Sequence, residues 1–287
     1  MTRFRRLSGA ALLLSALLLS LGCSQTDNPR PFTFVQLCDP QLGFGGYDSD
    51  LLRLEQAVRQ IDAMQPKPDF VVVCGDLVHA PGTDDEWARQ YGDLKKALSE
   101  LTVPCYIVPG NHDVGKAPTA EALQRYRKYV GKDYYAFDHK GCTFVMADSQ
   151  LWMKDVPRES DAQDRFVRQA VKSAHDKGLK VFVVQHIPLF VRSPDEPAQS
   201  SSLPPEIRKD LLEFYRKNGV VAILSGHLHD HLDWQYNSIQ LVTGETTSVM
   251  NKGRPRGFRV WHVSGAPPFR NEFVALVNRY EPAAAHK

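Results

Sequence analysis

Short, mostly apolar runs recur along this chain, and each of them ends in residues with polar side chains. Runs of four to six residues rich in Val, Ile and Phe are typical of buried strands. Between the first and second runs, Leu51, Leu54, Val58 and Ile61 recur at helical spacing. The runs are Phe34–Cys38, Phe70–Cys74, Cys105–Val108, Val181–Gln185 and Val221–Ser225.

The order of these patterns predicts an α/β fold. Helices expected at 47–64 and 87–101 alternate with the first three strands, which predicts right-handed crossovers and a parallel sheet core. The middle of the chain predicts helices at 121–130, 162–177 and 206–218, a hairpin at 134–148, and a long loop at 193–205. We therefore expect two packed mixed β-sheets flanked by helices, in one domain spanning 32–280.

After His229 the pattern alternates between apolar and polar residues. Strict alternation is typical of strands with one buried face, often in antiparallel sheets. We expect these strands to be antiparallel and to belong to the second sheet. Their ranges are 232–236, 239–243, 258–263 and 273–277.

The N-terminus has the pattern of an export signal. Arg3, Arg5 and Arg6 precede an apolar stretch at 7–21, which is shorter than the roughly 20 residues of a spanning helix. Residues 20–23 resemble a bacterial lipobox that ends at Cys23. We expect a signal peptide at 1–23, lipidation of Cys23, a linker at 24–31, a tail at 281–287 and a periplasmic or cell-envelope lipoprotein anchored to the membrane. An ordinary cleaved signal is the alternative.

Charge and cysteine usage exclude two classes of protein. A net charge of +2 argues against a dedicated nucleic-acid surface, so we expect no nucleic-acid partner. Cys38, Cys74, Cys105 and Cys142 form no C-x-x-C pair, which argues against a zinc knuckle. Buried free thiols are the simplest interpretation of these cysteines, with a disulfide after export as the alternative.

The polar residues at the strand ends form a set of metal ligands. Asp39 and Gln41 are two apart, as are His227 and His229, so each pair points one way in an extended segment. The set of carboxylates, amides and imidazoles suits Mn²⁺, Zn²⁺ or Fe²⁺. Seven ligands are too many for one such ion, which indicates two divalent ions that share a carboxylate and attract an anionic ester. The set is Asp39, Gln41, Asp76, Asn111, His186, His227 and His229.

Five motifs along the chain resemble those of the calcineurin-like metallophosphoesterases, closest to the serine/threonine phosphatase type of calcineurin-like phosphoesterase domain-containing proteins. The matching segments are Asp39–Gln41, Gly75–Asp76, Gly110–Asp113, His186 and Gly226–His229. The resemblance implies a four-layer α/β/β/α fold and hydrolysis of phosphate monoesters by a metal-bound hydroxide, in a phosphorylated small molecule or a phosphoprotein.

The resemblance also implies a role for each ligand. It places one metal on Asp39, Gln41, Asp76 and His229, and the second on Asp76, Asn111, His186 and His227. It makes His112 the general acid for the leaving oxygen, with Asn111 and His112 both contacting the substrate.

Two departures from the family pattern affect this interpretation. Most of the superfamily has His where Gln41 stands, and a neutral amide oxygen should loosen the first site or favour Mn²⁺. Gln also occurs there in ADP-ribose/CDP-alcohol diphosphatases, so a nucleotide diphosphatase or phosphodiesterase is the alternative function. Protein serine/threonine phosphatases have Asp at the position of His79 to orient the catalytic His, and Asp113 is the candidate for that role here.

Two further interpretations remain open at this point. Arg254 and Arg256 could bind the non-reacting part of the substrate, or could lie at a solvated hairpin end. A non-catalytic metal-binding lipoprotein is the alternative from outside the enzymes, although a scaffold does not need seven metal ligands and His112.

Overall fold

The computed structural model describes residues 29–251 and 253–277. The predicted signal peptide with Cys23, most of the 24–31 linker and the 281–287 tail therefore lie outside the described residues. Within them the strands are β1 (Phe32–Leu37), β2 (Phe70–Cys74), β3 (Cys105–Val108), β4 (Tyr135–His139), β5 (Cys142–Met146), β6 (Lys180–Val184), β7 (Val220–Ser225), β8 (Leu232–Tyr236), β9 (Ile239–Thr243), β10 (Gly257–Val263) and β11 (Arg270–Ala275).

The helices in the same part of the chain include the expected ones and two short additions. They are α1 (Tyr47–Asp62), α2 (Asp84–Ser99), α3 (Asn111–Val114), α4 (Ala120–Tyr129), α5 (Gln150–Met153), α6 (Glu159–Asp176) and α7 (Pro205–Lys217). The additions, α3 and α5, are single turns directly after strands, too short for an apolar period to reveal them. Among the described residues, no helix combines the length and the apolar character that crossing a membrane requires.

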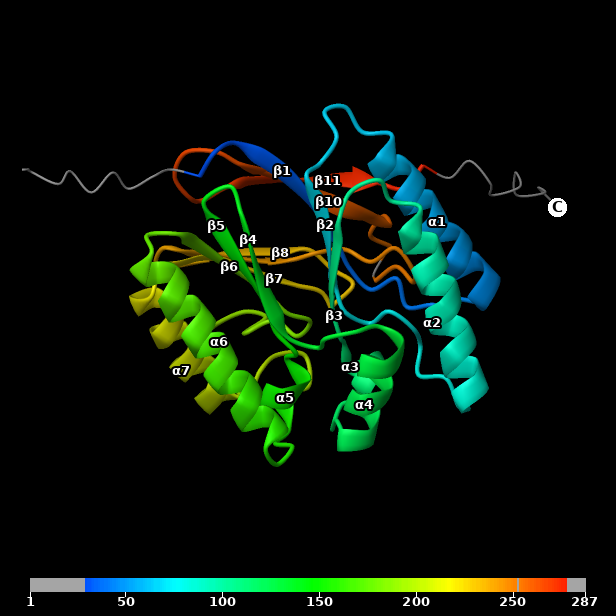
Figure 1. Ribbon diagram of the computed structural model, residues 1–287, viewed down its shortest axis with the longest axis horizontal. Helices are drawn as coiled ribbons and strands as arrows, with labels where there is room; N and C mark the ends of the chain where they lie inside the picture. The colour runs from blue at the N-terminus through cyan, green and yellow to red at the C-terminus, as the bar shows by residue number, and fades with distance from the viewer. Residues whose placement is uncertain (1–28, 252, 278–287) are drawn as a thin grey trace, which may run out of the picture.

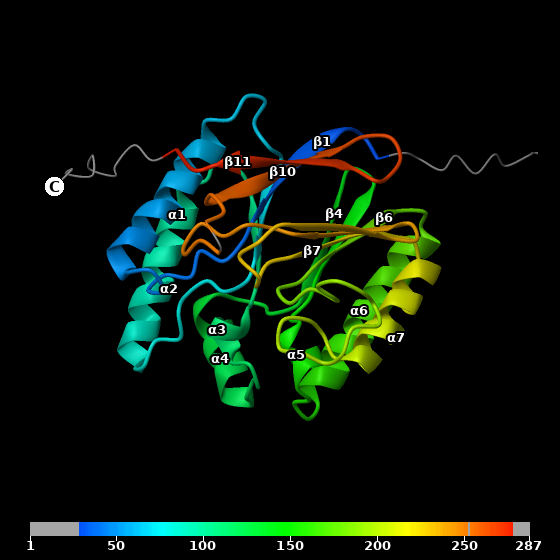
Figure 2. The same cartoon turned by 180° about the vertical axis from the view of Figure 1, so that it is seen from behind.

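Two mixed sheets form the centre of the described molecule, as predicted. The first has the order β11-β10-β1-β2-β3, in which β1, β2 and β3 are parallel. The second has the order β4-β5-β6-β7-β9-β8, in which β5, β6, β7 and β9 are parallel. Figures 1 and 2 show α1 and α2 outside the first sheet and α6 and α7 outside the second. The predicted fold class is confirmed.

The prediction for the last strands was wrong in two respects. β10 pairs antiparallel with β1, and β11 pairs with β10, so both belong to the first sheet. β9 lies parallel to β7, although β8 pairs antiparallel with β9 as expected. Alternation along a strand indicates that one face is buried, but it does not identify the neighbouring strand.

Three hydrophobic clusters fill the three spaces between these four layers. In β1, Val35 and Leu37 pack against α1 and α2, whereas Phe34 points the other way, into the space between the sheets. There the Phe34 ring stacks on Trp261, with centroids 5.7 Å apart, and lies edge-on to Phe144 of the second sheet. The third cluster joins α6 and α7 to the second sheet. Burial on both faces explains why these strands are continuous apolar runs.

Candidate metal centre

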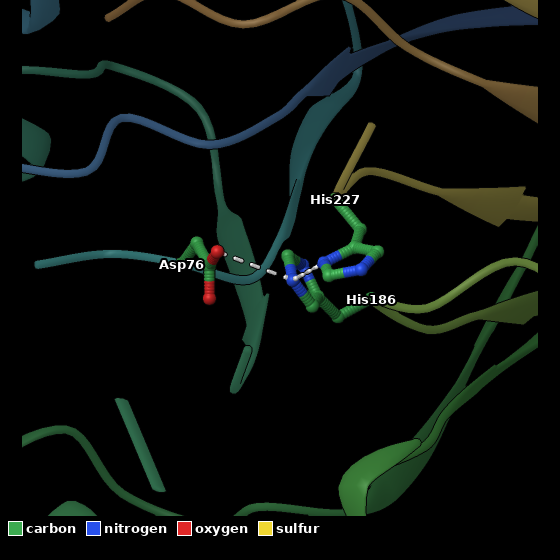
Figure 3. Close-up of side chains that lie close together, drawn as sticks. All are labelled: Asp76, His186 and His227. Atoms are coloured by element: carbon green, nitrogen blue, oxygen red, sulfur yellow. Dashed lines mark hydrogen bonds and ion pairs between the residues drawn. The ribbon is translucent and has the colours of Figure 1, made fainter. Parts of the chain in front are cut away.

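The ends of the parallel strands place four predicted ligands around one point. His186 Nε2 lies 3.3 Å from Asp76 Oδ2, 3.2 Å from His227 Nδ1 and 3.1 Å from Asn111 Oδ1. Figure 3 shows Asp76, His186 and His227 pointing toward one another from three segments of the chain. These four residues are the set that the family resemblance implies for the second metal.

Backbone carbonyl groups fix the orientation of the three histidines. His186 Nδ1 lies 2.8 Å from Cys74 O, His229 Nδ1 lies 3.0 Å from Val249 O, and His227 Nε2 lies 3.1 Å from Ser200 O. Because a carbonyl oxygen only accepts, each of these nitrogens carries the proton. The other nitrogen of each ring is then free to bind a metal, which is the arrangement found around metal-ligating histidines.

Asp39 and Gln41 also lie beside these ligands: Asp39 Oδ1 is 3.9 Å from His186 Nδ1, and Gln41 lines the same cavity as Asp76. Asp39 Oδ1 is 3.5 Å from His229 Nε2, and the Asp39 carboxylate also accepts the backbone N–H of His227 at 3.0 Å. Gln41 Oε1 is buried and has no hydrogen-bond partner in the described structure. An unpartnered buried amide oxygen is costly, and coordination of a cation would satisfy it.

Backbone strain is concentrated at the same residues. Nine described residues other than glycine have a positive φ, a conformation that L-residues rarely adopt. Five of the nine are predicted ligands, and such strain is frequent at functional sites. They are Asp39, Gln41, Asp76, His227 and His229, with φ between 42° and 72°.

The charges in the centre favour a cation at His186 Nε2. Burial lowers the pKa of His186, but the carboxylates of Asp76 and Asp39 outweigh burial and raise the pKa to about 10. Burial raises the pKa of Asp76, and the charge of His186 outweighs it in the opposite direction. In the absence of a metal, a proton binds His186 Nε2. A divalent ion would replace this proton and contact the donor atoms of Asp76, Asn111 and His227. The donor set fits a metal ion.

His112 lies beside this centre on α3. Its backbone N–H donates to Asp76 Oδ1 at 2.8 Å, and its Nε2 lies 4.0 Å from Asp76 Oδ2. The ring stacks on the His79 ring with centroids 4.5 Å apart. The side chain of His112 is about a quarter exposed, so it can contact a substrate in the cavity.

An open cavity of about 320 Å³ leads from the surface to these residues. Lys116 contributes a cationic side chain to its wall. Phe44 and Met250 also line it and are 43% and 42% exposed, so the rim is partly apolar. The lining residues are Gln41, Phe44, Asp76, Asn111, His112, Lys116, His227, Leu228, His229, Val249, Met250 and Asn251.

Comparison with known proteins agrees with this geometry. Residues 32–231 match the family described as calcineurin-like phosphoesterase. The serine/threonine-protein phosphatase CPPED1 of Rattus norvegicus is 34% identical over 250 residues, which cover 80% of each chain. The chain belongs to the calcineurin-like phosphoesterase family. It is a hydrolase that acts on phosphoric ester bonds.

Other relatives of this phosphoesterase are more distant. The probable glycerophosphodiester phosphodiesterase GpdQ of Arcobacter nitrofigilis is 26% identical over 203 residues, which cover 68% of this chain and 69% of the relative. The crystal structure of a dimetal phosphatase from Danio rerio superposes with a TM-score of 0.64 at 15% identity, covering 87% of this chain and all of that one. The structural likeness establishes a shared fold.

Two predicted substrate-binding residues do not line the cavity of the phosphoesterase. Arg254 Nε lies 2.6 Å from Asp230 Oδ1 in an ion pair, and Arg256 Nε donates to the Ser248 carbonyl. The basic sequence motif predicted a substrate contact, but the Arg254 side chain contacts Asp230 and the Arg256 side chain contacts Ser248. Lys116, in the turn after α3, lines the cavity, and no motif in the sequence singled it out.

The structure also corrects the role expected for Asp113. Its buried carboxylate accepts the backbone N–H groups of Gly110 at 2.7 Å and Leu77 at 3.1 Å, and the Tyr91 hydroxyl at 3.2 Å. Consecutive residues of a helical turn point about 100° apart, so Asp113 faces the core while His112 faces the cavity. Asp113 joins the loop after β3 to the loop after β2, and His79 is the residue that contacts the His112 ring.

Proposed function

We propose that this phosphoesterase hydrolyses phosphate monoesters at two divalent metal ions and that phosphoserine and phosphothreonine proteins are its substrate class. The observation that carries the proposal is the arrangement around Asp76. Three other predicted ligands converge on one side of its carboxylate, and His112 lies 4.0 Å away at the cavity wall.

The described donor atoms divide between two ions. Asp39, Gln41, Asp76 and His229 would hold the first, and Asp76 would share the second with Asn111, His186 and His227. Divalent ions held there would supply positive charge to phosphoryl oxygens and lower the pKa of bound water toward neutrality. Mn²⁺, Zn²⁺ and Fe²⁺ all accept this set of oxygen and nitrogen donors, and the neutral Gln41 oxygen favours Mn²⁺ at the first site.

The protein's own residues supply the other parts of the reaction. His112 lines the cavity, where a protonated imidazole could donate to the leaving oxygen of a serine or threonine side chain. Lys116 adds positive charge for the anionic ester. The Asn111 amide lies at the same wall and can donate to a phosphoryl oxygen through its nitrogen while its oxygen faces His186.

The shape of the cavity supports a large substrate. Its rim is open and partly apolar, with Phe44 and Met250 each more than two fifths exposed. Such a rim suits a phosphorylated side chain that remains attached to a protein surface. Similarity to a protein named as a serine/threonine-protein phosphatase, across 80% of both chains, favours the same class.

The test is a comparison of substrates with the Mn²⁺-loaded enzyme. We expect kcat/KM for a phosphoserine peptide and for p-nitrophenyl phosphate to exceed that for bis-p-nitrophenyl phosphate by at least tenfold. The same panel, repeated with Zn²⁺ and Fe²⁺, ranks the metals. Faster hydrolysis of the diester would contradict the proposal.

A diesterase is the second candidate, because one relative is named as a probable glycerophosphodiester phosphodiesterase. A phosphodiester carries one negative charge, whereas a phosphoserine monoester carries about −1.5 to −2 at pH 7, so the cationic Lys116 at the cavity wall favours the monoester. Glycerophosphodiesters and ADP-ribose, added to the same panel, distinguish diester and diphosphate hydrolysis from monoester hydrolysis.

We also propose that the enzyme acts outside the cytoplasm. The support is the sequence at 1–23, with its basic start, apolar stretch and Cys23 in a lipobox-like context. Lipidation of Cys23 would attach the enzyme to the cell envelope.

A further inference from the structure

His79 lies between two functional parts of the site. It follows β2 on the loop that carries Asp76, and its ring stacks between Phe44 and His112, with centroids 4.6 Å and 4.5 Å away. Its Nδ1 lies 3.3 Å from Gln41 Nε2. Protein serine/threonine phosphatases have Asp at this position, so the contacts of a histidine here need an explanation of their own.

The contact with Gln41 determines which end of the amide faces the metal centre. A glutamine amide has an oxygen that can bind a cation and an NH₂ group that cannot. Because the oxygen and the nitrogen of the amide point in different directions, binding of the nitrogen to His79 leaves the oxygen directed elsewhere. With Nε2 donating to His79 Nδ1, the buried and unpartnered Oε1 is the atom left for the metal.

We propose that His79 is a positioning residue for the metal centre, which accepts a hydrogen bond from Gln41 Nε2 and thereby turns Gln41 Oε1 toward the first metal ion. This inference rests on the two-metal centre of the proposed function. A histidine ligand at position 41 would need a different partner, an acceptor for its second ring N–H, because the other ring nitrogen would bind the metal. The histidine at position 79 compensates for the glutamine at position 41.

The loops that carry these two residues are held together without the His79 side chain. Gln41 N donates to Asp76 O at 2.9 Å, Leu42 N donates to Leu77 O at 3.1 Å, and His79 N donates to Leu42 O at 2.9 Å. These bonds use backbone atoms alone. A substitution that changes only the side chain at 79 therefore leaves the backbone arrangement intact and tests the side-chain contact.

Two variants separate the hydrogen bond from the ring stacking. His79→Phe keeps a ring between Phe44 and His112 but removes the acceptor. His79→Asn removes the ring but keeps an acceptor, because its Oδ1 stands close to the position of Nδ1. His262→Phe is the matched control, since His262 lies on β10 and pairs with Glu272 rather than with a ligand.

The measurement is calorimetric titration of metal-free protein with MnCl₂, with thermal unfolding of the metal-free forms alongside. We expect His79→Phe to weaken one of two Mn²⁺ sites by about 10-fold or more, the usual loss when a partner of a metal ligand is removed. We expect His79→Asn to stay within about twofold of the wild type because it keeps the acceptor, and His262→Phe to do so because His262 contacts no ligand. All metal-free midpoints should agree with the wild type.

A second set of variants, built on Gln41→Glu, tests whether the effect of His79 depends on the amide of Gln41. In Gln41→Glu both ends of the side chain are oxygens, so orientation no longer matters, and adding His79→Phe should change Mn²⁺ affinity by less than about twofold. The inference is overturned if His79→Phe binds Mn²⁺ like the wild type, if His79→Asn loses as much affinity as His79→Phe, or if His79→Phe lowers the metal-free midpoint. The titration contains no ester, so failure to hydrolyse monoesters would contradict the proposed function alone.

Discussion

At the scale of single residues, the carboxylate of Asp76 is the group on which the centre depends. It lies on a strained backbone, at φ 49°, and its two oxygens face different partners: Oδ1 accepts the His112 N–H, and Oδ2 faces His186. Gln41, in contrast, serves one proposed ion through a neutral oxygen. Replacing Asp76 should therefore reduce metal binding and activity more than replacing Gln41.

We predict that Asp76→Asn abolishes activity and lowers metal content at both sites, because an amide loses the charge that both ions share. Gln41→Ala should weaken the first site and retain measurable activity at saturating Mn²⁺. Metal content and kcat/KM of the two variants, measured together, check this. Equal losses would count against a shared Asp76.

His112 gives a second prediction at this scale. An alkoxide leaving from phosphoserine needs a proton, whereas nitrophenolate leaves almost unaided, and general acid catalysis is worth about 10²–10⁴-fold. We predict that His112→Asn keeps both metals, loses most activity on alkyl phosphates and loses much less on p-nitrophenyl phosphate. Metal content and kcat/KM for both substrates are measured. Equal slowing of the two substrates would mean that His112 binds the phosphoryl group instead.

At the scale of elements, the long segment between β6 and α7 is ordered by one carboxylate. Glu196 accepts the backbone N–H groups of Val191 and Arg192 at 2.9 and 2.8 Å, and lies 3.5 Å from the buried Arg208 of α7. The same segment presents the Ser200 carbonyl to His227. The predicted loop at 193–205 therefore contacts one of the predicted metal ligands.

The charge of Glu196 should contribute to stability. Burial raises its pKa, but hydrogen bonds from Ser202 and the backbone N–H groups outweigh burial and lower the pKa to about 2. Because this lies below the unfolded value of about 4.3, the ionised carboxylate stabilises the fold above that pH. The contribution is lost as the pH falls toward 2.

We therefore predict that Glu196→Gln lowers the free energy of unfolding by roughly 2 kcal/mol at pH 7, after allowance for solvent screening. The difference from the wild type should shrink below pH 4. Denaturant unfolding at several pH values measures it. Glu213→Gln, on the exposed face of α7, is the control and should change little. If the difference in unfolding free energy between Glu196→Gln and the wild type does not depend on pH, the charge of Glu196 does not stabilise the fold.

At the scale of the whole molecule, the two sheets meet with the carboxyl ends of their parallel strands at the same place. His186 after β6 donates to the Cys74 carbonyl at the end of β2, and the His227 N–H after β7 donates to Asp39 after β1. Each sheet supplies part of each proposed metal site. The two proposed metal ions would therefore be bound by residues from both sheets.

The cellular location of the enzyme also concerns the whole molecule. We predict that the wild type fractionates with membranes and that Cys23→Ala is either released as soluble protein outside the cytoplasm or left unprocessed, since the lipid would be carried by that residue. Membrane fractionation and N-terminal sequencing of both forms check this. A soluble wild type whose mature N-terminus is another residue would indicate an ordinary signal.

Local patterns in the sequence predict the strands that carry the site and the residue types at their ends. Val71, Val72 and Val73 are buried on both faces, so they form a continuous apolar run, and a short loop must follow at the sheet edge where Asp76 stands. The local pattern of apolar and polar residues is enough to predict such features. It also predicted the two-sheet α/β architecture, because helices and strands alternate along most of the chain.

Tertiary structure decided the features that depend on which segments become neighbours. Alternation in β10 did not reveal that its partner is β1, where Val263 pairs with Phe32. Arg254 pairs with Asp230, Asp113 faces Tyr91 in the core, and Lys116 lines the cavity, all through contacts between separate segments. A side chain's chemistry can be read from its type, but its partner is set by the packing of the whole chain, because contacts between distant segments leave no periodic signal in either one.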